Sequence, residues 1–421
     1  MTTPGTSVEP GSTSGAAFEA TPTRDATTLH PPLRRWAAVA AIGIGIFTLV
    51  TIEELPIGVL TLIADDLGVS RGVVGLAVTL PGVLAAVIAL VAPVITRRLD
   101  RRLVLVLALA AVVVSCGLSV LSTGMYSLLF SRIFAGIAIG LYWPAMPVIT
   151  VRQVPAERSA AALTVAFAGT GGALVLGVPL ASWLGSQLGW RESFMVVGGI
   201  ALLVLVAVLL LVRPVHADEP THLGDLLAAF QRRGVRYAVV MAGLLVSGQF
   251  LTYSYVSPLL QEAAGLEVDA VAPMLLVFGV AGLIGNFAAA PLLRRSPGAA
   301  VITISVGIAA ALLAIELLVH GPSLAVVLVA VWGLFGGAIS VVMQTFVTRY
   351  AGRYEESATA LNSTIFNLSI AMGALVGGRL IDTFGVRAPA WVSVVLIACA
   401  GVLAVRWIVT GGQRRQDEIA A

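Results

Sequence analysis

The feature that most constrains the fold is a series of long apolar runs, each able to cross a bilayer, which takes about 20 mainly apolar residues. The chain of 421 residues is 58% hydrophobic and only 11% charged, whereas a soluble domain carries about 25% charged residues. This pattern predicts an all-α integral membrane protein with twelve transmembrane helices. The predicted helices cover approximately residues 36–62, 72–96, 103–122, 127–150, 159–185, 193–212, 237–261, 271–293, 299–319, 323–348, 357–383 and 389–410.

The basic side chains, all of them arginines, are unevenly distributed over the connecting segments. If the N-terminus is cytoplasmic, 20 of the 25 arginines fall in cytoplasmic segments and three, Arg71, Arg191 and Arg387, fall in outer loops. Arg132 and Arg379 lie within predicted helices. Because cytoplasmic loops are enriched in basic residues, both ends of the chain are expected in the cytoplasm. Arginines dispersed over helix ends do not make a nucleic-acid surface, so no nucleic-acid partner is expected.

Short matches between the two halves of the chain indicate an internal duplication. Ala92-Pro93 before Arg97-Arg98 recurs as Ala290-Pro291 before Arg294-Arg295, and SAAAL at Ser159 recurs as SATAL at Ser357. The spacing is near 197 residues, which predicts two six-helix pseudo-repeats with a substrate site at midplane between them. The expected domains are a disordered cytoplasmic tail (1–33), an N-terminal half (34–213), a cytoplasmic loop with a short amphipathic helix (214–236), a C-terminal half (237–410) and a cytoplasmic tail (411–421).

Two adjacent carboxylates, Glu53 and Glu54, interrupt the first apolar run and are followed by Pro56. An acid at membrane depth is costly unless it is neutralised, paired or in contact with water, so it is a functional candidate. Proline has no N–H and leaves the carbonyl of Ile52 without its helical donor. A carboxylate that gains and loses a cation or water can load and release a proton. Glu53 is the favoured proton carrier; the alternative is a side chain that reaches the outer interface or stays hydrogen-bonded.

Arg132 is the strongest basic candidate because it lies inside the fourth run, whereas the duplicated position near Val329 is apolar. We hypothesise that Arg132 pairs with Glu53 or Glu54. The alternative is an arginine at a helix end that reaches lipid headgroups. Near the end of the eleventh run, Arg379 and Asp382 are three residues apart and are expected to pair on one face.

A set of amide and aromatic side chains within the predicted helices is expected to line a cavity. Amides can bond both edges of a heterocycle or sugar hydroxyls, and aromatic faces stack on planar rings. The alternative for each is a hydrogen bond between helices. The candidate substrate-binding residues are Tyr142, Trp143, Gln249, Tyr253, Tyr255, Asn286, Gln344, Asn362 and Asn367.

Metal and nucleotide chemistry find no support in the sequence. The two cysteines, Cys116 and Cys399, lie in separate apolar runs, and the four histidines lie outside or at the rims of the runs. Neither set has metal-ligand spacing. Without a Walker-type loop, ATP is not expected as the energy source. No cofactor is expected, and a proton gradient remains as the driving force.

Three motifs resemble those of the major facilitator superfamily, in its drug:proton antiporter branch with twelve helices. In the loop after the second run, Arg98, Arg101 and Arg102 keep basic positions of the diagnostic gating loop, whereas Asp100 replaces its second glycine. Arg132-Ile-Phe-Ala-Gly136 resembles the motif tied to proton coupling. The glycines and proline of the fifth run resemble the antiporter motif. These are Gly169, Gly171, Gly172, Gly177 and Pro179.

Two longer segments, TIEELPIGVLTLIADDLGVS and SGQFLTYSYVSPLL, are similar to bacterial purine ribonucleoside efflux pumps and, nearly as much, to sugar- and arabinose-efflux-like transporters. In this comparison Glu53 falls on the glutamate of the family, and Glu54 occupies a position that is normally aromatic. The resemblance implies the major facilitator fold and a multi-pass protein of the bacterial cytoplasmic membrane.

The function expected from these observations is proton-coupled efflux of a small organic molecule by alternating access, with purine nucleosides or drugs as candidate substrates. A sugar or metabolite exporter, or a uniporter of the same fold, remains open. A membrane enzyme or receptor is disfavoured, because no cluster of His, Ser or Cys appears at helical spacing. The expected partners are the substrate and the lipid bilayer, with a monomer as the default state.

Overall fold

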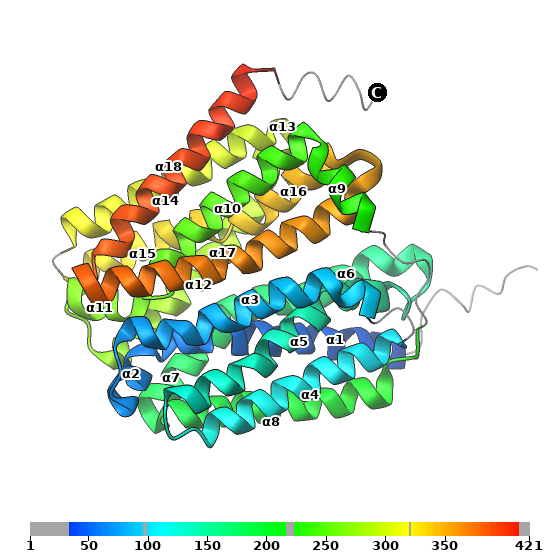
Figure 1. The fold of residues 1–421 in the computed structure, drawn as a ribbon, viewed down its shortest axis with the longest axis horizontal. Coiled ribbons are helices and arrows are strands. Elements are labelled where there is room, and N and C mark those ends of the chain that lie inside the picture. Colours follow the sequence, from blue (N-terminus) through cyan, green and yellow to red (C-terminus); the bar gives the residue numbers. More distant parts are fainter. Residues whose placement is uncertain (1–32, 96–98, 216–222, 320, 412–421) are drawn as a thin grey trace, which may run out of the picture.

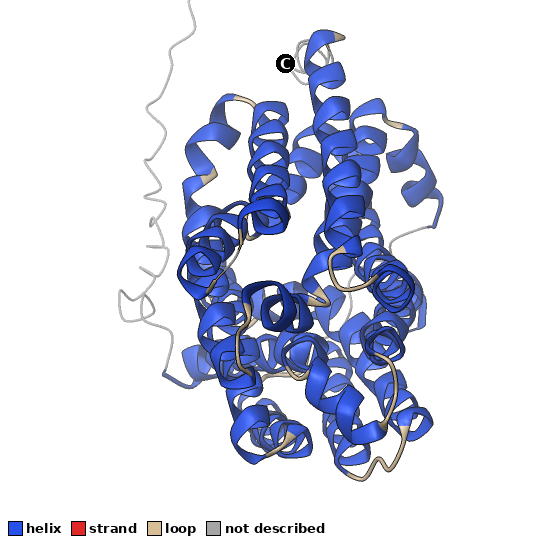
Figure 2. Cartoon of the chain, turned by 90° about the vertical axis from the view of Figure 1, so that its left-hand side faces the viewer, coloured by secondary structure: helices blue, strands red, loops and turns tan. Residues whose placement is uncertain are grey.

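The computed structural model describes residues 33–95, 99–215, 223–319 and 321–411. The predicted disorder of the N-terminal tail and the placement of the C-terminal tail concern residues that lie, apart from 33 and 411, outside this part of the chain. Within it the protein is helical without strands, and twelve helices are long and apolar enough to cross a membrane (Figures 1 and 2). The prediction of an all-α protein with twelve spans is confirmed.

The two halves of the chain lie side by side, with their helices running in roughly the same direction (Figure 1). The N-terminal half contains α1 (Leu33–Gly58), α2 (Leu60–Leu67), α3 (Arg71–Ile95), α4 (Arg101–Val120), α5 (Met125–Val151), η2 (Ala156–Arg158), α6 (Ser159–Gly172), the π-helical turn η3 (Ala173–Gly177), α7 (Val178–Leu188) and α8 (Trp190–Leu211). A short helix, α9 (Leu223–Gln231), precedes the second half. The C-terminal half contains α10 (Arg233–Tyr253), α11 (Val256–Ala264), α12 (Val268–Ala288), α13 (Ala290–Arg295), α14 (Pro297–Leu318), α15 (Pro322–Gly336), α16 (Ile339–Ala351), η4 (Gly352–Tyr354), α17 (Glu355–Phe384) and α18 (Ala388–Val409).

The first and seventh predicted helices are each broken at the same relative place. Val59, between α1 and α2, has φ −115° and ψ 19°, and Tyr255, between α10 and α11, has φ −119° and ψ 22°. The short helices that follow end on Gly68 and Gly265 at φ 61° and 66°, a conformation that favours glycine. The paired positions are 196 and 197 residues apart. The backbone therefore repeats at the spacing seen in the sequence, although apolar runs alone did not reveal the breaks.

Each half has its own apolar core, and the two cores exchange a few side chains. The core of the N-terminal half includes Tyr255 and Ile381 from the other half. The core of the C-terminal half includes Ile57, Val78 and Val178 in return. The halves are therefore two separately packed bodies, and rocking of one half against the other requires such packing. The exchanged side chains form contacts between them.

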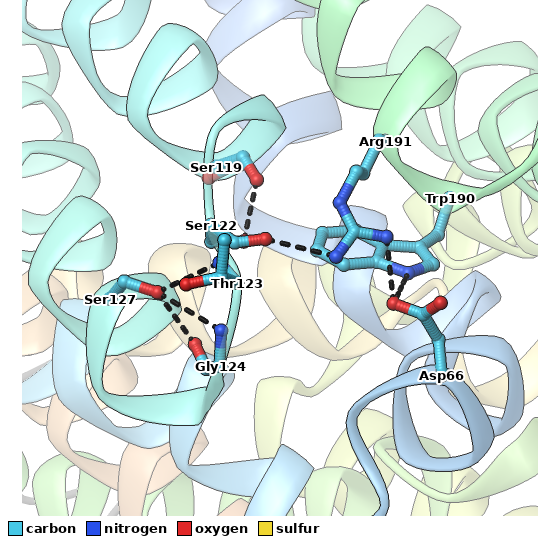
Figure 3. Close-up of polar contacts among 8 residues, drawn as sticks. All are labelled: Asp66, Ser119, Ser122, Thr123, Gly124, Ser127, Trp190 and Arg191. Carbon is cyan, nitrogen blue, oxygen red and sulfur yellow. Dashed lines mark hydrogen bonds and ion pairs between the residues drawn. The ribbon is translucent and has the colours of Figure 1, made fainter.

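A polar brace fixes the loops of the N-terminal half at the end where α2 lies (Figure 3). The Asp66 carboxylate accepts from the Arg191 guanidinium at 2.7 Å and from the Trp190 indole at 3.1 Å. Arg191 also donates to the Ser122 carbonyl at 2.9 Å and stacks over the Trp190 ring. The Ser127 hydroxyl accepts from the Thr123 and Gly124 N–H groups and caps the start of α5. The brace joins α2, the segment before α5 and the first turn of α8.

The Asp66 brace gives a testable dependence of stability on pH. The hydrogen bond from Arg191 lowers the pKa of Asp66 below its ordinary value. The stabilisation is therefore present above the unfolded pKa and is lost as the pH falls through the folded one. Because the pair is partly exposed, Asp66→Asn is expected to lower the free energy of unfolding by less than about 1 kcal/mol at neutral pH.

Thermal unfolding in detergent at neutral pH and below about pH 4 measures this effect. The difference between wild type and Asp66→Asn should shrink at the lower pH. The neighbouring exposed Asp65 supplies the control, Asp65→Asn, which should behave as wild type at both values. A difference that grows in acid would contradict the assignment.

Candidate transport site

The carbonyl that Pro56 leaves without a helical donor is bound by Arg132. The Arg132 side chain is 0% exposed and reaches from α5 to two other helices. Its Nη2 donates to the Ile52 carbonyl at 3.0 Å and to the Glu53 carbonyl at 3.3 Å, and its Nε donates to the Ala77 carbonyl of α3 at 2.9 Å. The alternative of an arginine that reaches headgroups is therefore wrong. Arg132 joins α1, α3 and α5 at membrane depth.

The hypothesised ion pair of Arg132 with a carboxylate is not formed in this conformation. The ion pairs between described residues join Arg71 to Glu262 and Arg191 to Asp66. The guanidinium instead binds backbone carbonyls, because Pro56 removes the helical donor of the Ile52 carbonyl and leaves a strong acceptor at that depth. Arg132 is still electrostatically coupled to the Glu53 carboxyl. Its Nη1 has no hydrogen-bond partner, so a donor remains available close to the carboxylate.

The two adjacent carboxylates face different surroundings, as their angular separation on a helix requires. Glu53 lies on the Arg132 side. Glu54 is 8% exposed, and one of its carboxylate oxygens, Oε2, is buried without a partner. The Tyr253 side chain of α10 interacts electrostatically with the Glu54 carboxyl. One carboxylate is thus coupled to a cation of its own half, and its neighbour is coupled to a tyrosine of the opposite half.

An aromatic cluster on α10, α12 and α15 surrounds the Tyr253 ring. Tyr253 stacks on Phe278 with centroids 4.8 Å apart, and Trp332 meets both rings edge-on at 6.1 and 5.2 Å. The Trp332 indole donates to Gln249 Oε1 at 2.9 Å. Sequence reasoning selected Gln249 and Tyr253 but missed Phe278 and Trp332. A lone tryptophan in an aliphatic helix was the available signal, since a buried indole N–H needs an acceptor.

The other predicted amides lie towards the end of the second half that is opposite α11. Asn362 donates to the Gln344 side chain at 3.0 Å, and Gln344 donates to the Thr359 hydroxyl at 3.0 Å. Asn362 Oδ1 is buried without a partner. Asn367 donates to the carbonyl one turn earlier, and Asn286 is half-buried. Asn362 and Gln344 therefore form a linked pair with one unused acceptor.

Three of the predicted aromatic contacts are used between helices here. The Tyr142 hydroxyl donates to the Ile42 carbonyl at 2.8 Å, where Gly45 leaves room for it. The Tyr255 hydroxyl donates to the Ala374 carbonyl at 2.6 Å. The Trp143 ring lies 6.4 Å from that of Phe167. In this conformation these rings brace helices.

The glycine-rich segment of the fifth span contains a π-helical turn, η3, which packs against α12 of the opposite half. Such turns are rare and occur often at functional sites. Gly177 ends the turn, and a Cβ there would lie 2.1 Å from Thr51 Oγ1. Pro179 follows in the first turn of α7, and Gly172 precedes η3 beside Phe47. The predicted antiporter-type residues thus form an irregular segment between α1 and the second half.

Several polar contacts join the halves at the end of the bundle that holds α2 and α11 (Figure 1). Asp382 of α17 accepts from the Ser70 hydroxyl at 2.6 Å and from the Gly72 N–H at 3.0 Å, at the start of α3. Arg71 pairs with Glu262, and Gln261 donates to the Thr61 hydroxyl. The predicted Arg379–Asp382 pair is wrong, because the first turn of α3 offers Asp382 unpaired N–H groups. Arg379 is exposed.

Glycines allow α3 and α17 to approach closely at this end. A Cβ at Gly72 would lie 2.3 Å from the Gly378 carbonyl oxygen, and one at Gly75 would lie 1.8 Å from the Tyr255 hydroxyl. Small residues at helix interfaces permit such close crossings in membranes. We call this contact region of α3, α11 and α17 the outer closure.

The predicted gating loop is described only in part, since Arg98 lies outside the described residues. Asp100 caps α4 by accepting from the Arg102 N–H at 2.9 Å, and it also accepts from the Val215 N–H at 2.9 Å. Arg101 N–H donates to the Val215 carbonyl, and the Arg102 guanidinium donates to the Leu209 carbonyl. The described part of the loop therefore fastens the end of α8 to the start of α4.

Comparisons with known proteins found relatives of this chain in sequence and in fold. The chain is 31% identical over 359 residues to the purine ribonucleoside efflux pumps NepI of Salmonella typhimurium (strain LT2) and Salmonella enteritidis PT4, which covers 84% of this chain and 89% of each relative. The fold matches a bacterial homologue of the human lysosomal transporter Spinster, solved inward-facing and unoccupied, with a TM-score of 0.70, 16% identity and coverage of 89% of this chain and 97% of that one. It also matches the human organic anion transporter MFSD10 (TETRAN), with a TM-score of 0.65, 19% identity and coverage of 89% and 100%.

The family profile described as Major Facilitator Superfamily matches residues 42–355 and 300–420. Together with the twelve helices in two repeats, this match shows that the chain has the major facilitator fold and is a transporter. The relatives are transporters, which agrees with the expectation that the chain is not an enzyme, and their efflux activity supports efflux of small molecules. The chain is a multi-pass membrane transporter that belongs to the Major Facilitator Superfamily.

Proposed function

We propose that this transporter exports a small, ring-bearing molecule in exchange for protons, with purine ribonucleosides as the first candidate substrates. The observation that carries the proposal is the pair Glu53 and Glu54. One carboxylate is coupled to the buried Arg132, and the other meets Tyr253 across the boundary between the halves. A movement of the halves changes the surroundings of both acids, as a coupled transporter requires.

The roles of the two acids differ in this proposal. Glu53 carries the proton, because rocking of the halves changes its access to water while Arg132 of the same half stays coupled to it. Glu54, the Tyr253 cluster and Gln249 contact the substrate, whose planar ring stacks on aromatic faces. The similarity to purine ribonucleoside efflux pumps over 84% of the chain favours that substrate class. The proton gradient supplies the energy, and no bound cofactor takes part.

The same contacts support a proposal for the conformation and the orientation of the protein. The outer closure joins the halves on one side, and this side faces the outside of the cell in our proposal. The arginine-rich connections then lie in the cytoplasm with both chain ends, in agreement with the positive-inside rule. In this proposal the structure represents an outward-closed state of a monomeric exporter.

Transport by purified protein in liposomes tests coupling. A pH gradient with an acidic lumen should drive uptake of a labelled purine ribonucleoside into these liposomes, and Glu53→Gln should abolish this uptake while substrate exchange without a gradient persists. Glu54→Gln should keep the response to the gradient but change substrate preference. The exposed Glu157 provides the control, Glu157→Gln, which should transport as wild type.

Other outcomes separate the rival functions. Exchange by the wild type that does not depend on the pH gradient would indicate a uniporter. Gradient-driven transport of a sugar, a drug or another metabolite in place of nucleosides would support proton coupling but would show that the proposed substrate class is wrong. Gradient-driven uptake by Glu53→Gln at the wild-type rate would refute the role given to Glu53.

A further inference from the structure

The short helix α9 lies at the end of the bundle opposite α2 and α11 (Figure 1). It packs against η4 and α17 of the C-terminal half. Its side chains Leu227 and Phe230 are 62% and 40% exposed. Exposed apolar side chains on an amphipathic helix at the end of a membrane bundle are typical of a helix that lies in the membrane interface.

The side chains of two arginines lie against the ring of one tyrosine beside this helix. The Arg232 guanidinium lies 5.4 Å from the centroid of the Tyr354 ring, and the Arg353 guanidinium lies 4.8 Å from it. Arg353 also donates to the Tyr354 hydroxyl at 2.6 Å. Gly352, at φ 58°, lets the Arg232 side chain lie against the backbone, since a Cβ there would be 2.8 Å from Nη1. Both guanidiniums lie within 5.4 Å of the same ring centroid, and two positive charges around one ring attract an anion.

The neighbouring arginine serves a different purpose. Arg233 donates to the Thr410 hydroxyl at 3.0 Å and lies over the rings of Tyr237 and Trp407. Arg232, by contrast, has no acidic partner among the described ion pairs. Its planar set of N–H donors matches the geometry of a phosphate. The contacts therefore single out Arg232 and Arg353 as donors that remain available.

We propose that Arg232 and Arg353 bind the phosphate of an anionic phospholipid whose acyl chains lie along Leu227 and Phe230. The pairing of a basic cluster with exposed apolar side chains fits a lipid better than a soluble anion, because only the lipid satisfies both. Basic pockets between the ends of membrane-spanning helices bind the head groups of anionic lipids in this way. The bound lipid fastens α9, and with it the connection between the halves, to the C-terminal half.

Titration of the purified full-length protein with phosphatidylglycerol, followed by native mass spectrometry, tests this proposal. Each arginine near the surface contributes about 1 kcal/mol, which corresponds to about fivefold in affinity. Arg232→Gln and Arg353→Gln are each expected to weaken phosphatidylglycerol binding about fivefold, and the double variant about thirtyfold. Arg406→Gln, at another exposed arginine of the same half, should bind as wild type.

Phosphatidylcholine and inorganic phosphate are titrated in parallel. Preference of the wild type for phosphatidylglycerol over both supports the site. The proposal is overturned if the variants keep wild-type affinity, if the two lipids bind equally, or if inorganic phosphate binds as tightly as the lipid. The single variants are measured before the double one, so that a folding defect in the double variant does not remove the test.

Discussion

Arg132→Met is expected to reduce gradient-driven transport to the level of empty liposomes. The substitution removes the only donor described for the Ile52 carbonyl and the cation coupled to Glu53. Each buried carbonyl left unpaired costs about 1–3 kcal/mol. Removal of a buried guanidinium with an unpartnered Nη1 offsets part of this cost. Activity should therefore fall far more than stability.

Arg132→Lys separates charge from geometry. An ammonium keeps the positive charge but cannot donate to carbonyls on α1 and α3 from one planar group, so it should recover little transport. The exposed Arg379 supplies the matched control, and Arg379→Met should leave transport unchanged. Transport rates in liposomes and thermal unfolding in detergent provide the two readouts. Wild-type transport by Arg132→Met would show that coupling does not pass through this residue.

Gly75→Ala is expected to hold the transporter open at the outer closure and to slow transport severely. The new Cβ would lie 1.8 Å from the Tyr255 hydroxyl, which is fixed by its hydrogen bond to the Ala374 carbonyl. Overpacking of this kind typically costs about 1–3 kcal/mol, which lowers the population of the closed state about fivefold to 150-fold. The open state itself is not strained, so the protein should still fold.

A second substitution tests whether the clash with the Tyr255 hydroxyl causes the slow transport of Gly75→Ala. Tyr255→Phe removes the clashing oxygen and should restore part of the transport of Gly75→Ala. Distances between spin labels at the exposed positions 65 and 267, in a cysteine-free background, report closure directly. We expect longer distances in Gly75→Ala and a shift towards wild type in the double variant. Gly124→Ala, at a position with nothing within 4 Å of the added Cβ, is the control for an added methyl group.

The sequence predicted those parts of the protein that depend on local pattern. Twelve spans and the duplication follow from apolar runs and repeated segments, and the acceptor freed at Ile52 follows from Pro56 alone. Which donor would fill that acceptor depends on how α1, α3 and α5 pack. The sequence therefore predicted a carboxylate partner for Arg132, where the structure has backbone carbonyls.

Contacts between distant helices set the limit of such prediction. Asp382 was assigned to Arg379 because they share a face of one helix. The closed halves instead bring Asp382 to the start of α3, which is 310 residues away at Gly72. Likewise, Phe278 and Trp332 join Tyr253 only through the packing of three helices. No spacing along the chain carries that information.

The exchange of side chains between the two cores gives the conformational cycle a temperature dependence. Separation of the halves at the outer closure must bring Tyr255, Ile381, Ile57 and Val78 out of the core that now encloses them. Exposure of apolar surface to water raises the heat capacity. The attraction between such surfaces also weakens on cooling. In the proposed orientation, the outward-open population should therefore grow as the temperature falls, even though no group has titrated and no ligand has bound.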